Sequence, residues 1–204
     1  MEKVLRKIIL ASKSVDRTEL LNRSGIPFEV LVSDIDEDKF KKRISDPILL
    51  VKELAKAKLL YVKDELLKKN SHALIIAADT VVELNGIIIG KAENPEEACK
   101  IIKNLMGKAH NLITGIAISD TDDPKIIIDH DITTVEFLTL SDAEIENYVK
   151  SNEWKGRAGA YSINDKASLF ISKINGSSSN VIGLPMHKIY EILKTDFGLS
   201  LFHM

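Results

Sequence analysis

The sequence is poor in cysteine and has no long apolar run. Cys99 is the only cysteine among 204 residues, which excludes an internal disulfide and a zinc site made of cysteines. The longest apolar runs, such as residues 73–78, fall far short of the roughly 18 residues that a membrane helix needs. Residues 1–14 alternate charged and apolar side chains, whereas a signal peptide has a continuous apolar core. We therefore expect a cytoplasmic protein with no membrane partner.

Neither sign of charge dominates, and aromatic residues are few. The chain has 28 Lys and Arg residues against 30 Asp and Glu residues, and aromatic residues make up 5% of it. A general nucleic-acid binder usually has a concentrated basic face, so this composition disfavours RNA or DNA binding. We expect no stable nucleic acid partner. No Pro/Gly/Ser-rich linker or internal repeat divides the chain, so we expect one domain over residues 1–204.

Apolar runs alternate with capping and turn residues along the chain. Asp46 followed by Pro47 predicts the start of a long amphipathic helix. Asn85 followed by Gly86 between apolar runs predicts a β-hairpin, and Ser141 begins a predicted capping box. Strands and helices mix with some adjacent strand pairs, so the fold class is α/β with a mixed sheet. Strands are expected at residues 8–11, 28–32, 73–82, 87–89, 111–119, 125–138 and 169–174, and helices at residues 15–23, 47–69, 95–107, 142–150 and from 185 onward.

Most common catalytic motifs are absent. The chain has no dinucleotide-binding glycine fingerprint, no His-Glu-x-x-His and no Gly-x-Ser-x-Gly. Residues 86–91 superficially resemble a phosphate-binding loop, but three residues instead of four separate the glycines, and Ala92 takes the place of the magnesium-binding hydroxyl. The hairpin interpretation is therefore preferred. The five histidines lack metal-ligand spacing.

Some polar residues lie at the ends of predicted elements, where active sites of α/β proteins usually lie. Ser12 and Ser14 stand between the first strand and the first helix, whose N-terminus is either an anion site or simply a capped helix end. Asp79, followed by Thr80, comes at the end of a buried apolar run. A carboxylate there is costly unless it is paired, hydrogen-bonded or bound to a metal, which favours a functional role for Asp79.

Other candidates carry less information on their own. Lys58 and Lys91 are ordinary solvated lysines unless a partner is found. Glu37, in the acidic turn 34–37, is either a metal ligand or a solvated carboxylate. Residues 156–164 form a small-residue loop ending at Asn164, which either binds a base or is a plain turn. The residues alone indicate no more than an α/β enzyme with a phosphate ligand.

Taken together, these segments resemble the Maf family, the septum-formation-inhibitor-like nucleoside triphosphate pyrophosphatases. The resemblance runs along nearly the whole chain, in order, through ILASKSVDRTELLNRSGIPFEV, SDIDE, AADTVV, GKAENPEEA, RAGAYSI and INGSSSNVIGLP. It implies an elongated mixed sheet flanked by helices, with two lobes around a deep groove, related to the inosine-triphosphate pyrophosphatases. It also implies a possible homodimer.

The resemblance further implies hydrolysis of a nucleoside triphosphate to the monophosphate and pyrophosphate with Mg²⁺ or Mn²⁺, which clears surplus or modified nucleotides. By position, Asp79 corresponds to the proton acceptor and, with Glu37, to the metal site. Lys58 and Lys91 correspond to catalytic cations. The expected substrate-binding residues are Ser12, Ser14, Asp16, Arg17, Thr80 and Asn164, of which Thr80 and Asn164 fall at positions tied to base selection.

The chain departs from the family pattern at several positions. Val15 replaces a proline, and Asp16 replaces the first of two arginines, which inverts a charge beside the expected site. Asn164 and Asp165 stand where the dTTP/UTP-directed branch has Gln and Gly. The remaining pattern still favours a pyrimidine substrate. Asp16 either repels phosphate or accepts a hydrogen bond from a base amino group, and its charge motivates an alternative function, a nucleotide-binding regulator of cell division that has lost catalysis.

Overall fold

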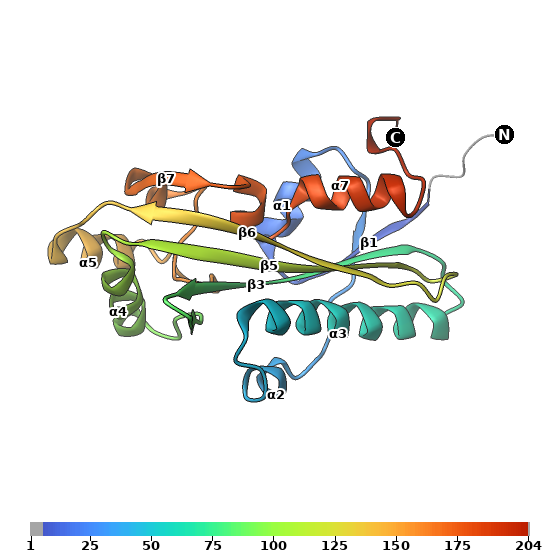
Figure 1. Cartoon of the computed structure of the whole chain (residues 1–204), viewed down its shortest axis with the longest axis horizontal. Helices are drawn as coiled ribbons and strands as arrows, with labels where there is room; N and C mark the ends of the chain where they lie inside the picture. The colour runs from blue at the N-terminus through green and yellow to red at the C-terminus, as the bar shows by residue number, and fades with distance from the viewer. Residues whose placement is uncertain (1–5, 204) are drawn as a thin grey trace.

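The computed structural model describes residues 6–203. The first five residues of the N-terminal stretch considered above, and the last residue of the chain, lie outside the described residues. The described chain forms a seven-stranded mixed sheet in the order β2-β1-β3-β5-β6-β7, and β4 pairs with β3 off this path. Helices flank the sheet along its length (Figure 1). The predicted α/β class with a mixed sheet is therefore confirmed.

Three long antiparallel strands make up the centre of the sheet. They are β3 (Leu74–Leu84), β5 (Ala109–Asp120) and β6 (Ile127–Phe137). β1 (Ile8–Ala11) runs parallel to β3, and β2 (Glu29–Val30) runs parallel to β1. The central strands are rich in Ile, Val and Thr, which suit a pleated surface. Their length gives the molecule the elongated outline seen in Figure 1.

Two shorter strands extend this centre. β4 (Ile87–Ile89) folds back on β3 through the predicted Asn85-Gly86 turn, in which both residues have positive φ. β7 (Ile171–Asn175) pairs with β6 at one edge of the sheet. It begins two residues later than predicted because Lys166–Leu169 form a short 3₁₀ helix.

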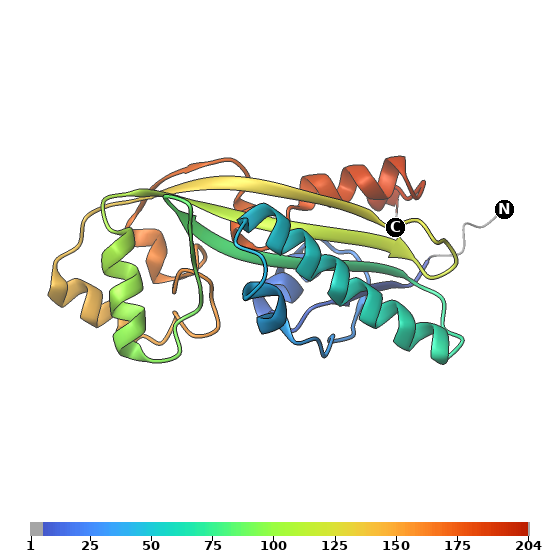
Figure 2. The ribbon, with the colours of Figure 1, turned by 60° about the horizontal axis from the view of Figure 1, so that its bottom comes forward.

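The helices pack in three places around the sheet (Figures 1 and 2). One long helix lies along one face, two helices lie on the opposite face, and two more lie at the far end of the long strands. The long helix is α3 (Pro47–Lys68). The opposite face carries α1 (Val15–Arg23) and α7 (Met186–Thr195). The helices at the far end are α4 (Pro95–Leu105) and α5 (Asp142–Lys150). Within the described residues, no helix is both long and apolar enough to cross a membrane.

Successive residues of β3 serve different cores because strand side chains alternate between faces. Ile75 and Ala77 pack in the core beneath α3, whereas Ile76 and Ala78 pack beneath α1 and α7. Farther along, Val82 belongs to a third core, under α4 and α5. The long central strands therefore contribute to more than one hydrophobic core.

The predicted helix signals are confirmed. The Asp46 side chain caps α3, with Pro47 as the first helical residue, and Ser141 forms the capping box of α5. Two short helices were not predicted. α2 (Glu37–Lys41) begins at the last residue of the expected acidic turn, and α6 (Ser178–Ile182) lies in the serine-rich stretch before the last helix. Each spans five residues, which is too short to show helical periodicity in the sequence.

Candidate active site

An interruption in strand pairing opens one edge of β3. β1 pairs with β3 only as far as Ala77, and β4 begins to pair with it at Val82. Within residues 6–203, the segment 78–81 therefore has no strand partner on this edge. The chain leaves β1 on one side of the interruption and leaves β4 on the other. Polar residues that follow these strands are brought together here, and Asp79 and Thr80 lie in the interrupted segment itself.

Asp79 faces α3 and forms an ion pair there. The Nζ of Lys58 lies 2.5 Å from Asp79 Oδ1 and 2.8 Å from Glu37 Oε1, so one ammonium group joins the two carboxylates. Asp79 and Lys58 are 8% and 9% exposed, which means that the pairing offsets the cost of burying their charges. Burial by itself would raise the pKa of Glu37, but Lys58 dominates and lowers that pKa to about 2. Glu37 therefore stays ionised at neutral pH.

On the other face of β3, the guanidinium of Arg17 is held by four hydrogen bonds. Its Nε donates to the Gly183 carbonyl at 2.6 Å, and Nη1 donates to the Ala78 carbonyl at 2.9 Å and to Ser12 Oγ at 3.2 Å. Nη2 donates to Thr80 Oγ1 at 2.9 Å. Burial lowers the pKa of Arg17, while Asp79 and Glu37 act in the opposite direction. Arg17 is thus a fixed buried cation with one N–H left over.

The two serines before α1 have distinct positions. Ser14 is the N-cap of the helix and accepts from the backbone N–H of Arg17. The hydroxyl of Ser12 is buried and accepts from the Ser14 backbone N–H at 3.2 Å as well as from Arg17. The capping interpretation of Ser14 is confirmed, and Ser12 lies beside the Arg17 guanidinium near the positively polarised end of α1.

The sequence reasoning missed residues that support Arg17 and Thr80 from behind. Thr80 Oγ1 lies 2.9 Å from Thr114 Oγ1, and Thr114 donates to the backbone carbonyl of Asn180 at 3.1 Å. Gly183 ends α6 with φ 104°, and a Cβ at this position would lie 3.0 Å from Arg17 Nε and from Thr80 Oγ1. Two features of the sequence could have indicated these residues: Thr114 is a polar residue in an apolar strand, and Gly183 is the last glycine of INGSSSNVIGLP.

Lys91 leaves β4 at the far side of the interruption. Its backbone forms an isolated bridge with Ala158, which anchors it to the loop before Tyr161. The side chain is exposed, but the surrounding protein partly desolvates it and lowers its pKa, whereas Glu37 and Asp79 tend to raise that pKa. Lys91 thus interacts electrostatically with the same two carboxylates that Lys58 contacts directly.

The remaining predicted residues lie at the rim. The Asp16 carboxylate is bound by Arg157, whose Nη2 and Nε lie 2.9 and 3.1 Å from its two oxygens. The negative charge that distinguishes this chain is therefore met by a guanidinium. Asn164 is exposed, and in the described part of the chain no hydrogen bond joins its side chain to another predicted site residue.

The carboxylates can be tested against a divalent cation. No group of three or more His, Cys, Asp or Glu side chains within the described residues could hold a metal by itself. Glu37 and Asp79, both drawn to Lys58, are the two carboxylates that the site offers. Mg²⁺ is typically bound by one or two carboxylates together with substrate phosphates and water, so this pair fits magnesium better than a metal that needs a complete protein cage.

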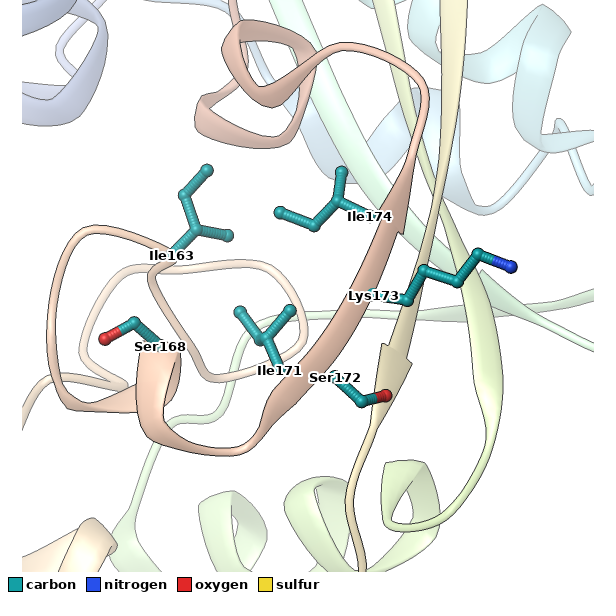
Figure 3. Close-up of a pocket in the computed structure, with 6 residues that line it drawn as sticks. All are labelled: Ile163, Ser168, Ile171, Ser172, Lys173 and Ile174. Carbon is teal, nitrogen blue, oxygen red and sulfur yellow. The ribbon is translucent and has the colours of Figure 1, made fainter.

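A pocket of about 390 Å³ lies elsewhere, between β7 and the segment that precedes it (Figure 3). None of the predicted site residues lines it. Its lining is formed by Ile163, Ser168, Ile171, Ser172, Lys173 and Ile174, among which Lys173 is the only charged side chain. It lacks the converging charges of the β3 edge.

The structure is thus an α/β fold with buried carboxylates and cations gathered at the open edge of β3. The family profile described as "Maf-like protein" matches residues 7–196. The chain belongs to this family, which confirms the family predicted from the sequence.

Curated relatives match along almost the entire chain. A protein named dTTP/UTP pyrophosphatase from Alkaliphilus oremlandii (strain OhILAs) is 44% identical over 97% of this chain and 100% of its own length. Proteins of the same name from Desulforamulus reducens and Caldanaerobacter subterraneus subsp. tengcongensis are 40% and 39% identical, over 97% and 95% of this chain and 100% and 91% of their own lengths.

One solved structure shares a more distant likeness. A crystal structure of a nucleoside-triphosphatase described as a dITP/XTP pyrophosphatase, from Mycobacterium abscessus, covers 66% of this chain and 75% of its own. Its sequence identity is 9% and its TM-score is 0.37, which is too low to bear on fold or function.

Proposed function

We propose that this protein is a metal-dependent nucleoside triphosphate pyrophosphatase, which hydrolyses the α–β phosphoanhydride of a pyrimidine nucleoside triphosphate. The observation that carries the proposal is the joining of Asp79 and Glu37 through Lys58 at the open edge of β3. The names of the relatives, dTTP/UTP pyrophosphatase, support both the reaction and the pyrimidine.

The charges of the site suit a triphosphate. Such a substrate carries about four negative charges, which must be neutralised before water can approach the α-phosphorus. The Arg17 guanidinium bonds to Ala78 and Thr80 in the interruption, and Lys91 follows β4 on its far side. The N-terminus of α1 adds a partial positive charge. A Mg²⁺ or Mn²⁺ ion held by Glu37 and Asp79 together with substrate oxygens would supply further charge neutralisation.

Asp79 is the proposed proton acceptor. Lys58 orients its carboxylate at 2.5 Å and leaves the second oxygen available for a water molecule. As the water oxygen bonds to the α-phosphorus, its proton passes to Asp79, and the bridging P–O bond breaks to release pyrophosphate. No covalent protein nucleophile is needed, so Cys99 and the serines have no catalytic task.

Base selection is assigned to Thr80 and Asn164. Thr80 is fixed by Arg17 and Thr114, so its position is rigid. Asn164 is exposed and keeps the donor and acceptor of an amide, which suits a pyrimidine edge. We assign the reaction to nucleotide pools in the cytoplasm, where it would remove surplus or modified nucleotides. The homodimer that the resemblance implies stays a prediction.

The decisive experiment is a pyrophosphate-release screen with Mg²⁺ or Mn²⁺ across dTTP, UTP, CTP and modified nucleotides. We expect dTTP and UTP to be hydrolysed to the monophosphate. Asp79→Asn should lower kcat by about 10³-fold, because general-base catalysis typically contributes 10²–10⁴-fold. Glu83→Gln on the same strand, outside the interrupted segment, serves as the matched control and should remain active. A wild-type protein that turns over no nucleotide would end this proposal.

The alternative of a division regulator without catalysis rested on the charge of Asp16. Because Arg157 binds that carboxylate, the charge no longer argues against phosphate binding. Calorimetry would decide between the two functions, since tight nucleotide binding without pyrophosphate release would favour the regulator.

A further inference from the structure

An ion pair crosses from one side of the interrupted β3 edge to the other. Arg157 contacts both carboxylate oxygens of Asp16, although the two residues are 141 positions apart in the sequence. Bidentate contacts between arginine and a carboxylate fix orientation as well as distance. Among the described residues, no other ion pair joins α1 to the segment 151–165.

On the loop side, Arg157 is held firmly. Its Nη1 donates to the Glu153 carbonyl at 2.6 Å, and its Nη2 lies 3.1 Å from Asp165. The hydrogen bond with Asp16 raises the pKa of Arg157. The next residue, Ala158, is the backbone partner of Lys91. The position of Arg157 is therefore tied to that of Lys91.

On the helix side, Asp16 directly precedes Arg17 in the first turn of α1. The Arg17 guanidinium is anchored to β3 and to Gly183 by the hydrogen bonds described above. The Asp16–Arg157 pair thus connects the segment that carries Arg17 with the segment that carries Lys91.

We propose that the Asp16–Arg157 pair is a strut that sets the separation of Arg17 and Lys91 across the β3 edge, which makes Arg157 a positioning residue for the reaction. The inference rests on the proposed function, because it assigns the two cations to one triphosphate. It goes beyond that function by giving Asp16 a favourable role. A displacement of about 1 Å in such a site can cost about 100-fold in rate.

The direction in which Asp16→Asn changes activity distinguishes the strut from simple repulsion between Asp16 and the phosphates. If Asp16 acted only as a negative charge beside the phosphates, Asp16→Asn would strengthen substrate binding. If Asp16 holds the strut, the same change releases Arg157 and weakens catalysis, although it removes a negative charge.

The test compares kcat and KM of the wild type with those of Asp16→Asn, Arg157→Gln and the double variant, using the best nucleotide from the screen. We expect kcat/KM of each single variant to fall about tenfold, through a lower kcat and a higher KM. The double variant should lose no more than either single variant. Arg157→Lys should retain an intermediate value. Glu19→Gln removes an exposed negative charge from the same helix and should stay within about twofold of the wild type. Unchanged or improved kcat/KM in Asp16→Asn, or losses that multiply in the double variant, would overturn the strut.

A measurement without nucleotide keeps this inference separate from the proposed function. Amide hydrogen exchange in residues 157–165 should accelerate in Asp16→Asn and Arg157→Gln but not in Glu19→Gln. Accelerated exchange in a protein that hydrolyses no nucleotide would refute the pyrophosphatase and retain the connection between the two segments. Unchanged exchange in Arg157→Gln would refute the strut even if the wild type is active.

Discussion

The two ends of the sheet bury polar groups by different means. At the end covered by α1, α3 and α7, the buried core residues are aliphatic, and the buried polar groups include the charged side chains of Arg17, Lys58 and Asp79. At the end covered by α4 and α5, the core contains five aromatic side chains, and the buried polar groups are neutral. There, His110 Nε2 lies 2.9 Å from the hydroxyl of Tyr161.

This difference between charged and neutral buried groups indicates which end of the sheet can carry out a reaction. Burial lowers the pKa of His110 to about 4 and raises that of Tyr161 well above its usual value, so both are neutral near pH 7. Their hydrogen bond and the edge-to-face contacts with Phe137 stabilise the end of the sheet under α4 and α5 without net charge. The charged end instead keeps ionised groups that can be redirected toward a substrate.

Removing the shared cation should produce the largest effect of the comparison. Lys58→Met leaves Glu37 and Asp79 without their common partner, and breaking a buried ion pair in this way typically costs about 3–5 kcal/mol. We expect a loss of about 3 kcal/mol in the free energy of unfolding at pH 7, measured with urea, and a loss of about 10²-fold or more in kcat. Lys56→Met, two residues earlier on α3, is the matched control.

The pH dependence of this loss checks its cause. Glu37 has a pKa of about 2 in the folded protein, below the 4.5 of the unfolded chain, so its contribution is complete above pH 4.5 and is lost as the pH falls toward 2. The difference in unfolding free energy between wild type and Lys58→Met should therefore shrink between pH 4.5 and 2. A difference that stays constant over this interval would mean that Lys58 stabilises the fold through packing rather than charge.

A smaller effect is expected from the glycine behind Arg17. Gly183→Ala places a Cβ in a left-handed conformation, 3.0 Å from Arg17 Nε and from Thr80 Oγ1. We expect kcat/KM to fall about tenfold, because the guanidinium must shift. Gly25→Ala imposes a similar backbone strain at φ 72° with no atom within 4 Å, so it should lower stability without lowering kcat/KM. Equal activities of the two variants would mean that Gly183 does not act through the position of Arg17.

Much of this charged end could be predicted from the sequence. Asp79 stood out because a carboxylate in an apolar strand needs a partner, and the caps of Ser14 and Asp46 located α1 and α3. The pairing of these groups could not be predicted from the residues themselves, although the family resemblance placed Lys58 among the catalytic cations. Lys58 and Arg157 look like ordinary surface cations in the sequence, and only the tertiary fold brings them to Asp79 and Asp16.

The aromatic end was less predictable for a different reason. His110 lies just before the predicted strand 111–119, and its side chain gives no capping or turn signal. Its burial follows from strand register and from packing against Phe137 and Tyr161, which a periodicity argument cannot resolve. Similarly, the interruption of β3 arises from where β1 and β4 end, which depends on pairing across distant segments.

The neutral pair at this end should give an effect that is seen only in acid. Because the pKa of His110 is about 4 when folded and 6.5 when unfolded, the unfolded chain binds more protons between these values. The unfolding free energy is therefore not reduced by His110 above pH 6.5. It declines as the pH falls toward 4, by at most about 3 kcal/mol. The double variant His110→Phe/Tyr161→Phe removes both polar groups together, so no buried donor is left unpaired, and its unfolding free energy should vary less over this interval. Urea unfolding at pH 7, 5.5 and 4.5 measures the slope, and a double variant as pH-sensitive as the wild type would place the acid sensitivity among the carboxylates of the charged end instead.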